Sequence, residues 1–189
     1  TAAQTYSDAV NLGADTTLAG TDLTLADTVD GAQVLTLNGS GTTTFGGAAG
    51  GTTALTSVTT NAAGDTAING GSVTTTAAQA YSDSVTLGAD TTLAGTDLTL
   101  DDTVDGAQAL TLNGSGTTTF GGAVGGTTAL TSVTTNAAGD TALNGGAVTT
   151  TAAQTYSDSV TLGADTTLAG TNLTLVDTVD GGQALTLNG

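Results

Sequence analysis

Three observations predict an all-β chain folded as a parallel β-solenoid, in which short coils stack along a single axis. The sequence has a long internal repeat, it contains short runs in which threonine alternates with apolar residues, and it is poor in bulky side chains. Of its 189 residues, 29 are glycine and only five are aromatic, three tyrosines and two phenylalanines. No stretch has helical periodicity, and glycine is too frequent to favour a helix.

The internal repeat is 75 residues long. Residues 1–75 and 76–150 are identical at 67 of 75 positions, and residues 151–189 match the start of the second copy at 35 of 39 positions. We therefore expect one continuous solenoid segment over residues 1–189, without separate domains. Because terminal repeats normally differ from the others as caps, the uniform copies also predict that the segment is an interior slice of a much longer array.

Exchanges between the copies separate the expected interior from the expected surface. Ile68 is replaced by Leu143 in the next copy, a volume-conserving change that is typical of a packed interior. Another repeat position holds Ala26, Asp101 and Val176 in turn. Only a solvent-facing site tolerates that range of side chains.

Each repeat divides into shorter units. In the second copy and its continuation these units are residues 96–115, 116–137, 138–154 and 155–170. Four units in 75 residues have a mean length of about 19, the size of one coil of a parallel β-helix. We therefore expect four coils per repeat.

Strands and turns follow from local patterns inside the units. Runs such as Leu98-Thr99-Leu100 and Leu110-Thr111-Leu112 alternate between apolar and β-branched polar residues, which predicts strands. Glycine, asparagine and aspartate interrupt these runs every five to ten residues, as turns require.

Tandem immunoglobulin-like β-sandwiches, one per repeat, are the alternative fold. The dipeptide Asn-Gly at Asn38, Asn113 and Asn144 favours a two-residue hairpin turn, which would suit a sandwich. However, each full copy has only one tyrosine and one phenylalanine for a sandwich core. The same turn residues also suit the corners of solenoid coils, so the solenoid is favoured.

Composition excludes most chemistry. The chain contains no lysine, arginine, histidine, cysteine, methionine, tryptophan or proline, its 17 acidic residues are all aspartate, and its net charge is −17. Without the usual general bases, nucleophiles and metal ligands, we expect no enzyme and no catalytic residue. Without a cation, we expect no nucleic-acid partner and no docking on anionic membranes. No apolar stretch reaches the length that membrane insertion needs.

The repeats resemble those of very large bacterial surface proteins. The resemblance covers the whole chain and is carried by units such as GTTTFGGAVGGTTALTSVTTNA, residues 116–137. The family is that of the filamentous-haemagglutinin-like and autotransporter-like adhesins. The resemblance implies a right-handed parallel β-helix, an extracellular location at the cell surface, and a structural or adhesive role as a fibre, stalk or sheath. It also implies further repeats of the same chain as the main partner, with lateral or end-to-end assembly.

Aspartate pairs are the only candidates for a metal site. The run Asp-Thr-Val-Asp-Gly occurs in all three copies and offers carboxylates three residues apart in a turn that contains glycine, a pattern that could give oxygen ligands to Ca²⁺. The sequence has neither an EF-hand loop nor the calcium-binding nonapeptide of β-rolls. Asx turns on a soluble surface are therefore the favoured interpretation, and calcium the alternative. The candidate residues are Asp27, Asp30, Asp102, Asp105, Asp177 and Asp180.

Two binding functions are alternatives to the fibre. Thr-rich strands could bind ice, but the units differ in length and in their threonine triplets, so we expect no regular threonine face. Tyr6, Tyr81 and Tyr156 could form an aromatic ladder for a glycan, but with four coils between them they are too far apart, and we expect them to pack at a coil edge. Asn-x-Ser/Thr triplets begin at Asn38, Asn113 and Asn172. They match N-glycosylation acceptors, a short pattern that occurs often by chance.

Overall fold

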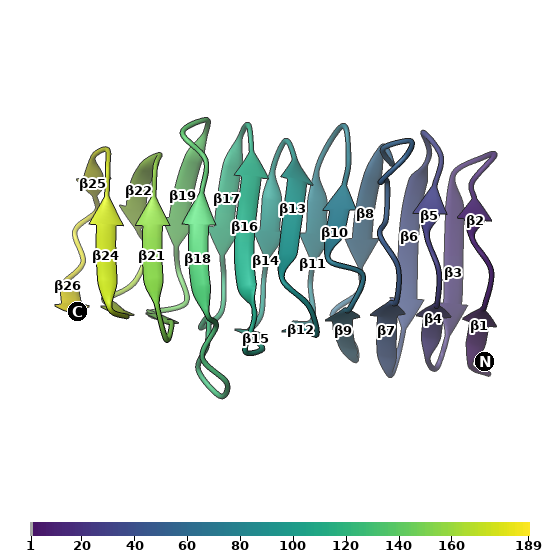
Figure 1. Ribbon diagram of the computed structural model, residues 1–189, viewed down its shortest axis with the longest axis horizontal. Coiled ribbons are helices and arrows are strands. Elements are labelled where there is room, and N and C mark those ends of the chain that lie inside the picture. Colours follow the sequence, from purple (N-terminus) through teal and green to yellow (C-terminus); the bar gives the residue numbers. More distant parts are fainter. Residues whose placement is uncertain (1) are drawn as a thin grey trace.

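The computed structural model describes residues 2–189 and confirms the parallel β-solenoid. Its described part consists of 26 short strands without a helix, and every strand pairing is parallel. Each coil contributes three strands to three faces of a prism, so the described residues form nine full coils and the first strand of a tenth (Figure 1). Asn-Gly makes no hairpin at Asn38 or Asn113, because both dipeptides lie inside strands whose partners are one coil away.

The three faces are continuous columns of strands. The first face contains β1 (Gln4–Tyr6), β4 (Leu23–Leu25), β7 (Thr42–Phe45), β9 (Asp65–Ile68), β12 (Ser84–Leu87), β15 (Val104–Asp105), β20 (Ala147–Thr149), β23 (Thr166–Ala169) and β26 (Leu185–Asn188). The second face contains β2 (Val10–Asn11), β5 (Val29–Asp30), β10 (Ser72–Thr74), β13 (Thr91–Gly95), β16 (Ala109–Gly114), β18 (Ser132–Thr135), β21 (Ala153–Tyr156) and β24 (Asn172–Leu175).

The third face is an uninterrupted nine-stranded sheet. It contains β3 (Thr16–Gly20), β6 (Val34–Gly39), β8 (Ser57–Thr60), β11 (Gln79–Tyr81), β14 (Leu98–Leu100), β17 (Thr117–Phe120), β19 (Asp140–Leu143), β22 (Ser159–Leu162) and β25 (Val179–Asp180). Single bridging residues complete the other two faces. Ala49 pairs with Val29 and Val73 on the second face, and Val124 pairs with Val104 and Val148 on the first.

The winding of the coils is right-handed. In Figure 1 the strands of the second face run upward in front, and those of the third face run downward behind them. Over the same view the chain advances from its N-terminus on the right to its C-terminus on the left. Upward motion in front combined with an advance to the left describes a right-handed turn, the hand that parallel crossovers favour.

Coil length varies at the corners and leaves the strand register intact. The commonest spacing is 19 residues, as between the paired residues Gln4 and Leu23. The spacing widens to 23 between Thr43 and Thr66 and to 24 between Val124 and Val148. The extra residues leave the coil as loops, of which the one before β18 projects below the rod in Figure 1.

The expectation of four coils per repeat was wrong. Residues 1–75 hold the ten strands β1–β10 and the Ala49 bridge, which makes eleven strand positions at three per coil. A repeat therefore covers three and two-thirds coils, because three of its four units supply three strand positions each and the shortest unit, residues 155–170, adds only two, β22 and β23. Equivalent segments consequently move to a different face in each copy: β1 is on the first face, β11 on the third and β21 on the second.

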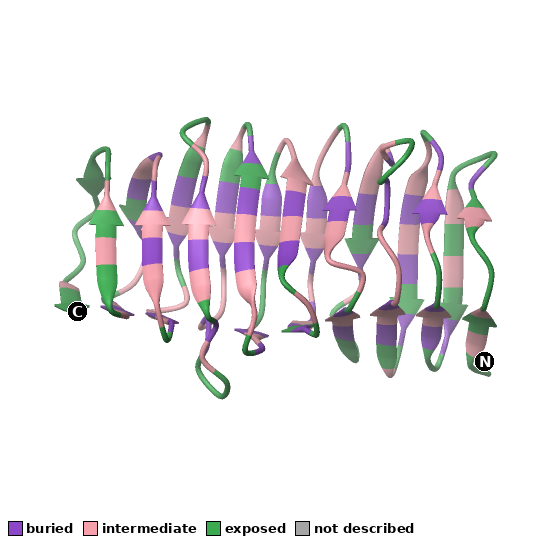
Figure 2. Ribbon diagram, in the orientation of Figure 1, coloured by how far each residue is buried: buried purple, intermediate pink, exposed green. Residues whose placement is uncertain are grey.

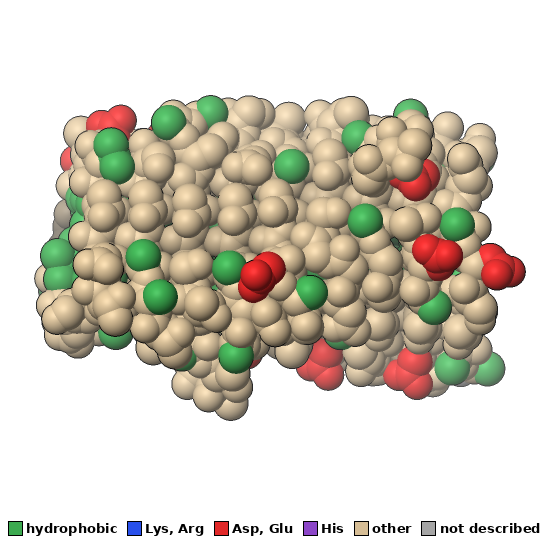
Figure 3. Space-filling model, viewed as in Figure 1, with side chains coloured by type: hydrophobic (Ala, Val, Ile, Leu, Met, Phe, Trp, Pro, Cys, Tyr) green, Lys and Arg blue, Asp and Glu red, His purple; other side chains and the backbone are tan. Residues whose placement is uncertain are grey.

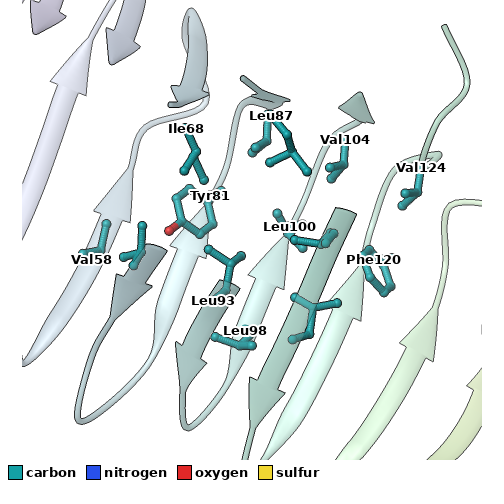
Figure 4. Packing of buried hydrophobic residues seen from close by; sticks show 14 of the residues in the cluster. Val58, Ile68, Tyr81, Leu87, Leu93, Leu98, Leu100, Val104, Phe120 and Val124 are labelled. Atoms are coloured by element: carbon teal, nitrogen blue, oxygen red, sulfur yellow. The ribbon is translucent and has the colours of Figure 1, made fainter. Parts of the chain in front are cut away.

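The core is a narrow column of aliphatic side chains with a few aromatic rings. More and less buried residues alternate along most strands (Figure 2), and Leu, Val, Phe and Tyr side chains of successive coils stack inside the prism (Figure 4). Ile68 and Leu143 are 0% and 2% exposed, which confirms the expected interior position. Val176 is 65% exposed, which confirms that its repeat position faces solvent.

Candidate functional site

The first candidate calcium ligand of each pair lies in a corner, and the second ends one of the short strands β5, β15 and β25. Asp27 Oδ1 accepts from the backbone N–H of Thr28 at 2.7 Å. The equivalent carboxylates of Asp102 and Asp177 accept from the residue that follows each of them, also at 2.7 Å. In each case the bonded N–H belongs to the next residue, not to the residue two positions on that an Asx turn uses.

The second aspartate of each pair joins one coil to the next. Asp30 Oδ1 accepts from the backbone N–H groups of Thr52 and Thr53, at 2.8 and 2.9 Å. In the second copy, Asp105 makes the same two bonds to the equivalent loop. Asp180, at the end of β25, is exposed. The described residues contain no group of three or more His, Cys, Asp or Glu side chains that could hold a metal ion.

Several other aspartates connect neighbouring coils in the same way. Asp90 Oδ1 accepts from the backbone N–H of Ala109 at 2.9 Å, and Asp97 Oδ1 accepts from that of Thr117 at 2.9 Å. Equivalent bonds are made by Asp15, Asp22 and Asp165. Each satisfies a corner N–H that the β ladder leaves unpaired. In the sequence, each of these aspartates lies 19 to 23 residues before the N–H group that it bonds. This separation can be interpreted only when the stacking of the coils is known.

Sequence analysis missed two buried carboxylates, Asp83 and Asp158. They occupy the same repeat position and are 2% and 3% exposed. Asp83 lies at the corner between β11 and β12, where Thr60 donates a hydrogen bond to Oδ1 at 2.6 Å. Thr66 donates to the same carboxylate from the other side of the corner, at 3.0 Å to Oδ1 and 2.9 Å to Oδ2. Burial raises the pKa of Asp83, although both hydroxyl bonds oppose the shift.

Asp158 repeats this arrangement on another corner of the prism. Thr135 donates to its Oδ1 at 2.6 Å and Thr141 to its Oδ2 at 2.8 Å. Each pair of threonines brackets a widened corner of the coil below, residues 61–65 and 136–140. We name each group, one aspartate and the two threonines beneath it, a carboxylate bridge. The first copy holds Asp8 at the same repeat position, and Asp8 is exposed.

The tyrosines form no ladder, and the expectation that they pack at a coil edge is also corrected. Tyr81 and Tyr156 are inside the core, each 0% exposed, and their hydroxyl groups donate to Gln79 and Gln154 at 2.9 and 3.1 Å. Burial raises the pKa of both phenols. The tyrosines lie on three different faces, so they cannot present one aromatic surface.

Single columns of threonine run along the outside of the faces although the units differ in length, but, as expected, no Thr-x-Thr pair repeats in every coil. On the third face, residues in register form one column in which only two alanines interrupt the threonines before it ends at Asp180. Its members are Thr17, Thr36, Thr59, Ala80, Thr99, Thr119, Ala142 and Thr161. The register survives because extra residues leave at the corners. The next outward column mixes Thr117, Asp140 and Ser159.

The described surface of the rod is acidic and has no pocket. Figure 3 shows carboxylates scattered over one side with no basic side chain beside them. No pocket is found on the part of the chain that the structure describes. The asparagines of the three glycosylation triplets, Asn38, Asn113 and Asn172, are exposed. Within residues 2–189, no helix is long and apolar enough to cross a membrane.

Comparison with known proteins adds no relative. No family model matches the chain, and neither a curated protein nor a solved structure matches it. The fold and the side-chain geometry described above define the class of protein, an acidic right-handed parallel β-solenoid built from a 75-residue repeat.

Proposed function

We propose that the chain is a structural segment of an extracellular surface fibre, a stalk or sheath of the filamentous-haemagglutinin-like or autotransporter-like adhesin type in bacteria, without catalysis. The observation that carries the proposal is the unbroken stacking of coils. Three columns of parallel strands run the length of the described chain, and the aspartates add bonds between successive coils. Such a rod transmits force along its axis through backbone hydrogen bonds, and it exposes unpaired strand edges only at its ends.

The surface location is tested directly on cells of the source organism. An antibody against the purified chain should label intact cells and outline fibres or a sheath in electron micrographs. Labelling that requires permeabilised cells would contradict the proposal. The same antibody applied to a lysate provides the control for expression.

Cations are the partners that an acidic rod needs for assembly. With a net charge of −17 and no lysine, arginine or histidine, neighbouring rods repel one another. We propose that bulk cations permit lateral or end-to-end association, with Ca²⁺ more effective than Na⁺ because it bridges carboxylates. Light scattering and thermal unfolding are measured during NaCl and CaCl₂ titrations. Identical curves in all conditions would reject cation-dependent assembly.

The same titrations decide between screening and specific sites. If screening alone acts, enough NaCl reproduces the effect of Ca²⁺. If a chelator has an effect that high NaCl does not reverse, Asp102 and Asp105 and their counterparts become calcium ligands, and the turn interpretation is wrong.

Ice binding is the second candidate, favoured by the threonine column on the third face. Stacked strands repeat hydroxyl groups about every 4.8 Å along the axis. The neighbouring column is mixed and charged, so the fibre remains the better supported function. An ice-recrystallisation assay tests the alternative, with the variant Thr99→Lys/Thr119→Lys expected to abolish any activity that depends on the column. Inhibition by the native chain that this variant retains would assign the activity to another surface.

A further inference from the structure

We propose that the carboxylate bridge at Asp83 makes the solenoid proton-responsive, so that acidification tightens the contacts between the coils that Asp83 joins. The inference concerns the fold itself, and it stands whether or not the chain acts as a surface fibre. It rests on the burial of this carboxylate and on the hydroxyl groups that surround it.

The geometry leaves each bridge without a compensating charge. Asp83 is 2% exposed, and its hydrogen-bond partners from the coil below are the neutral hydroxyl groups of Thr60 and Thr66. The chain contains no lysine, arginine or histidine that could approach it. A buried carboxylate without a cation is stabilised less well than a carboxylate in water, even when it accepts two hydrogen bonds.

No ionisable group around Asp83 offers a positive charge to balance it. Asp65 lies in the coil below, at the start of β9, and it further raises the pKa of Asp83. Tyr81 precedes it on β11. Backbone bonds from Asp101 to Tyr81 and from Val85 to Thr103 place the corner with Asp101 and Asp102 above it.

The second bridge has the same surroundings. Asp140 lies in the coil below Asp158, Tyr156 precedes it, and the corner above carries Asp177. Every ionisable neighbour of either bridge is therefore acidic.

Protonation keeps the bridge intact and removes the buried charge. A neutral carboxyl still accepts from one threonine hydroxyl, and its own O–H can donate to the oxygen of the other. Because the folded protein raises the pKa of Asp83, the contribution of its proton to stability is fully present below the unfolded pKa of about 4 and is lost as the pH rises through the higher folded pKa. Acid therefore stabilises these contacts, which reverses the usual effect of a salt-bridged aspartate.

The first copy supplies a matched control. Asp8 has the same repeat position as Asp83 but is exposed. The variants Asp83→Asn and Asp8→Asn are compared with the native chain by thermal unfolding from about pH 4 to about pH 7, in high NaCl to screen surface repulsion. Each tenfold difference in proton affinity between the folded and unfolded states changes the folding equilibrium about tenfold over that range.

The native chain and Asp8→Asn should lose thermal stability in parallel as the pH rises, and Asp83→Asn should lose less. Equal slopes for all three proteins, or a slope in Asp8→Asn as shallow as that of Asp83→Asn, would overturn the proposal. Should Asp83→Asn fail to fold, a carboxyl ¹³C NMR titration of the native chain decides. Asp83 is expected to titrate above the ordinary aspartate pKa of about 4, and a midpoint at or below that value would overturn the proposal.

Discussion

The first coil and the coil that contains Tyr81 have nearly the same sequence but different environments. Residues 1–20 and 76–95 differ at only three positions. Yet Gln79, Tyr81 and Leu93 are 0% exposed, whereas their counterparts in the first coil are only partly buried. The later coil is covered on both sides and the first on one side. The comparison teaches that neighbouring coils decide burial in this molecule, as nearest-neighbour coupling in repeat proteins predicts.

The largest difference between the two coils is expected when the equivalent tyrosines, Tyr81 and Tyr6, are each replaced by alanine. Tyr81→Ala should lower the free energy of unfolding by about 3–5 kcal/mol, because it empties a fully buried site in the narrow core. Tyr6→Ala, on the half-covered coil, should cost about 1 kcal/mol or less. Urea denaturation followed by circular dichroism measures both values. Equal losses would mean that the first coil is as well packed as the later one.

The glutamine beside each tyrosine gives an intermediate effect. Gln79 Nε2 donates to the carbonyl oxygens of Val73 and Ala94 at 3.0 and 2.8 Å, and Gln79 Oε1 accepts from Tyr81. Gln79→Ala leaves these buried groups unpaired and should cost about 1–3 kcal/mol. Gln4 donates to one carbonyl only, that of Ala19, in an exposed setting.

Gln4→Ala is accordingly expected to cost less than Gln79→Ala in the same denaturation assay. A larger loss for Gln4→Ala would show that the first coil depends on its glutamine more than burial implies.

Two corner glycines, Gly106 and Gly182, extend the comparison to the corners, where we expect the smallest changes in stability. Gly106 has φ +129°, and an added Cβ would overlap the carbonyl oxygen of Leu87 in the coil below. Gly106→Ala should therefore destabilise the chain by more than about 1 kcal/mol. Gly182 has open space around its Cβ position, and the other copies hold Ala32 and Ala107 there.

Gly182→Ala should be neutral or slightly stabilising, because it reduces the freedom of the unfolded chain. Differential scanning calorimetry of both variants checks the pair. A neutral Gly106→Ala would mean that the corner relaxes without cost and that coil contacts are looser than the structure indicates.

The sequence predicted the strands well because they depend on local patterns. Alternation at Leu98-Thr99-Leu100 became β14, and the glycine of each Asp-Thr-Val-Asp-Gly run became a corner with positive φ. It predicted the function class only through exclusion and resemblance. Asp30 could be placed in a turn, but its bonds to Thr52 and Thr53 depend on which coil lies next to it.

By itself, therefore, the sequence determined an all-β solenoid with a 75-residue repeat, an acidic surface and a small aliphatic core. Only the tertiary structure decided that the repeat covers three and two-thirds coils, since a repeat counts residues whereas a coil closes after three strands. That mismatch rotates equivalent strands onto different faces, as with Tyr6, Tyr81 and Tyr156. Asp83 is buried whereas its repeat equivalent Asp8 is exposed, and this difference also arises from contacts between coils. Such contacts join residues about 20 positions apart, which a local sequence pattern does not reveal.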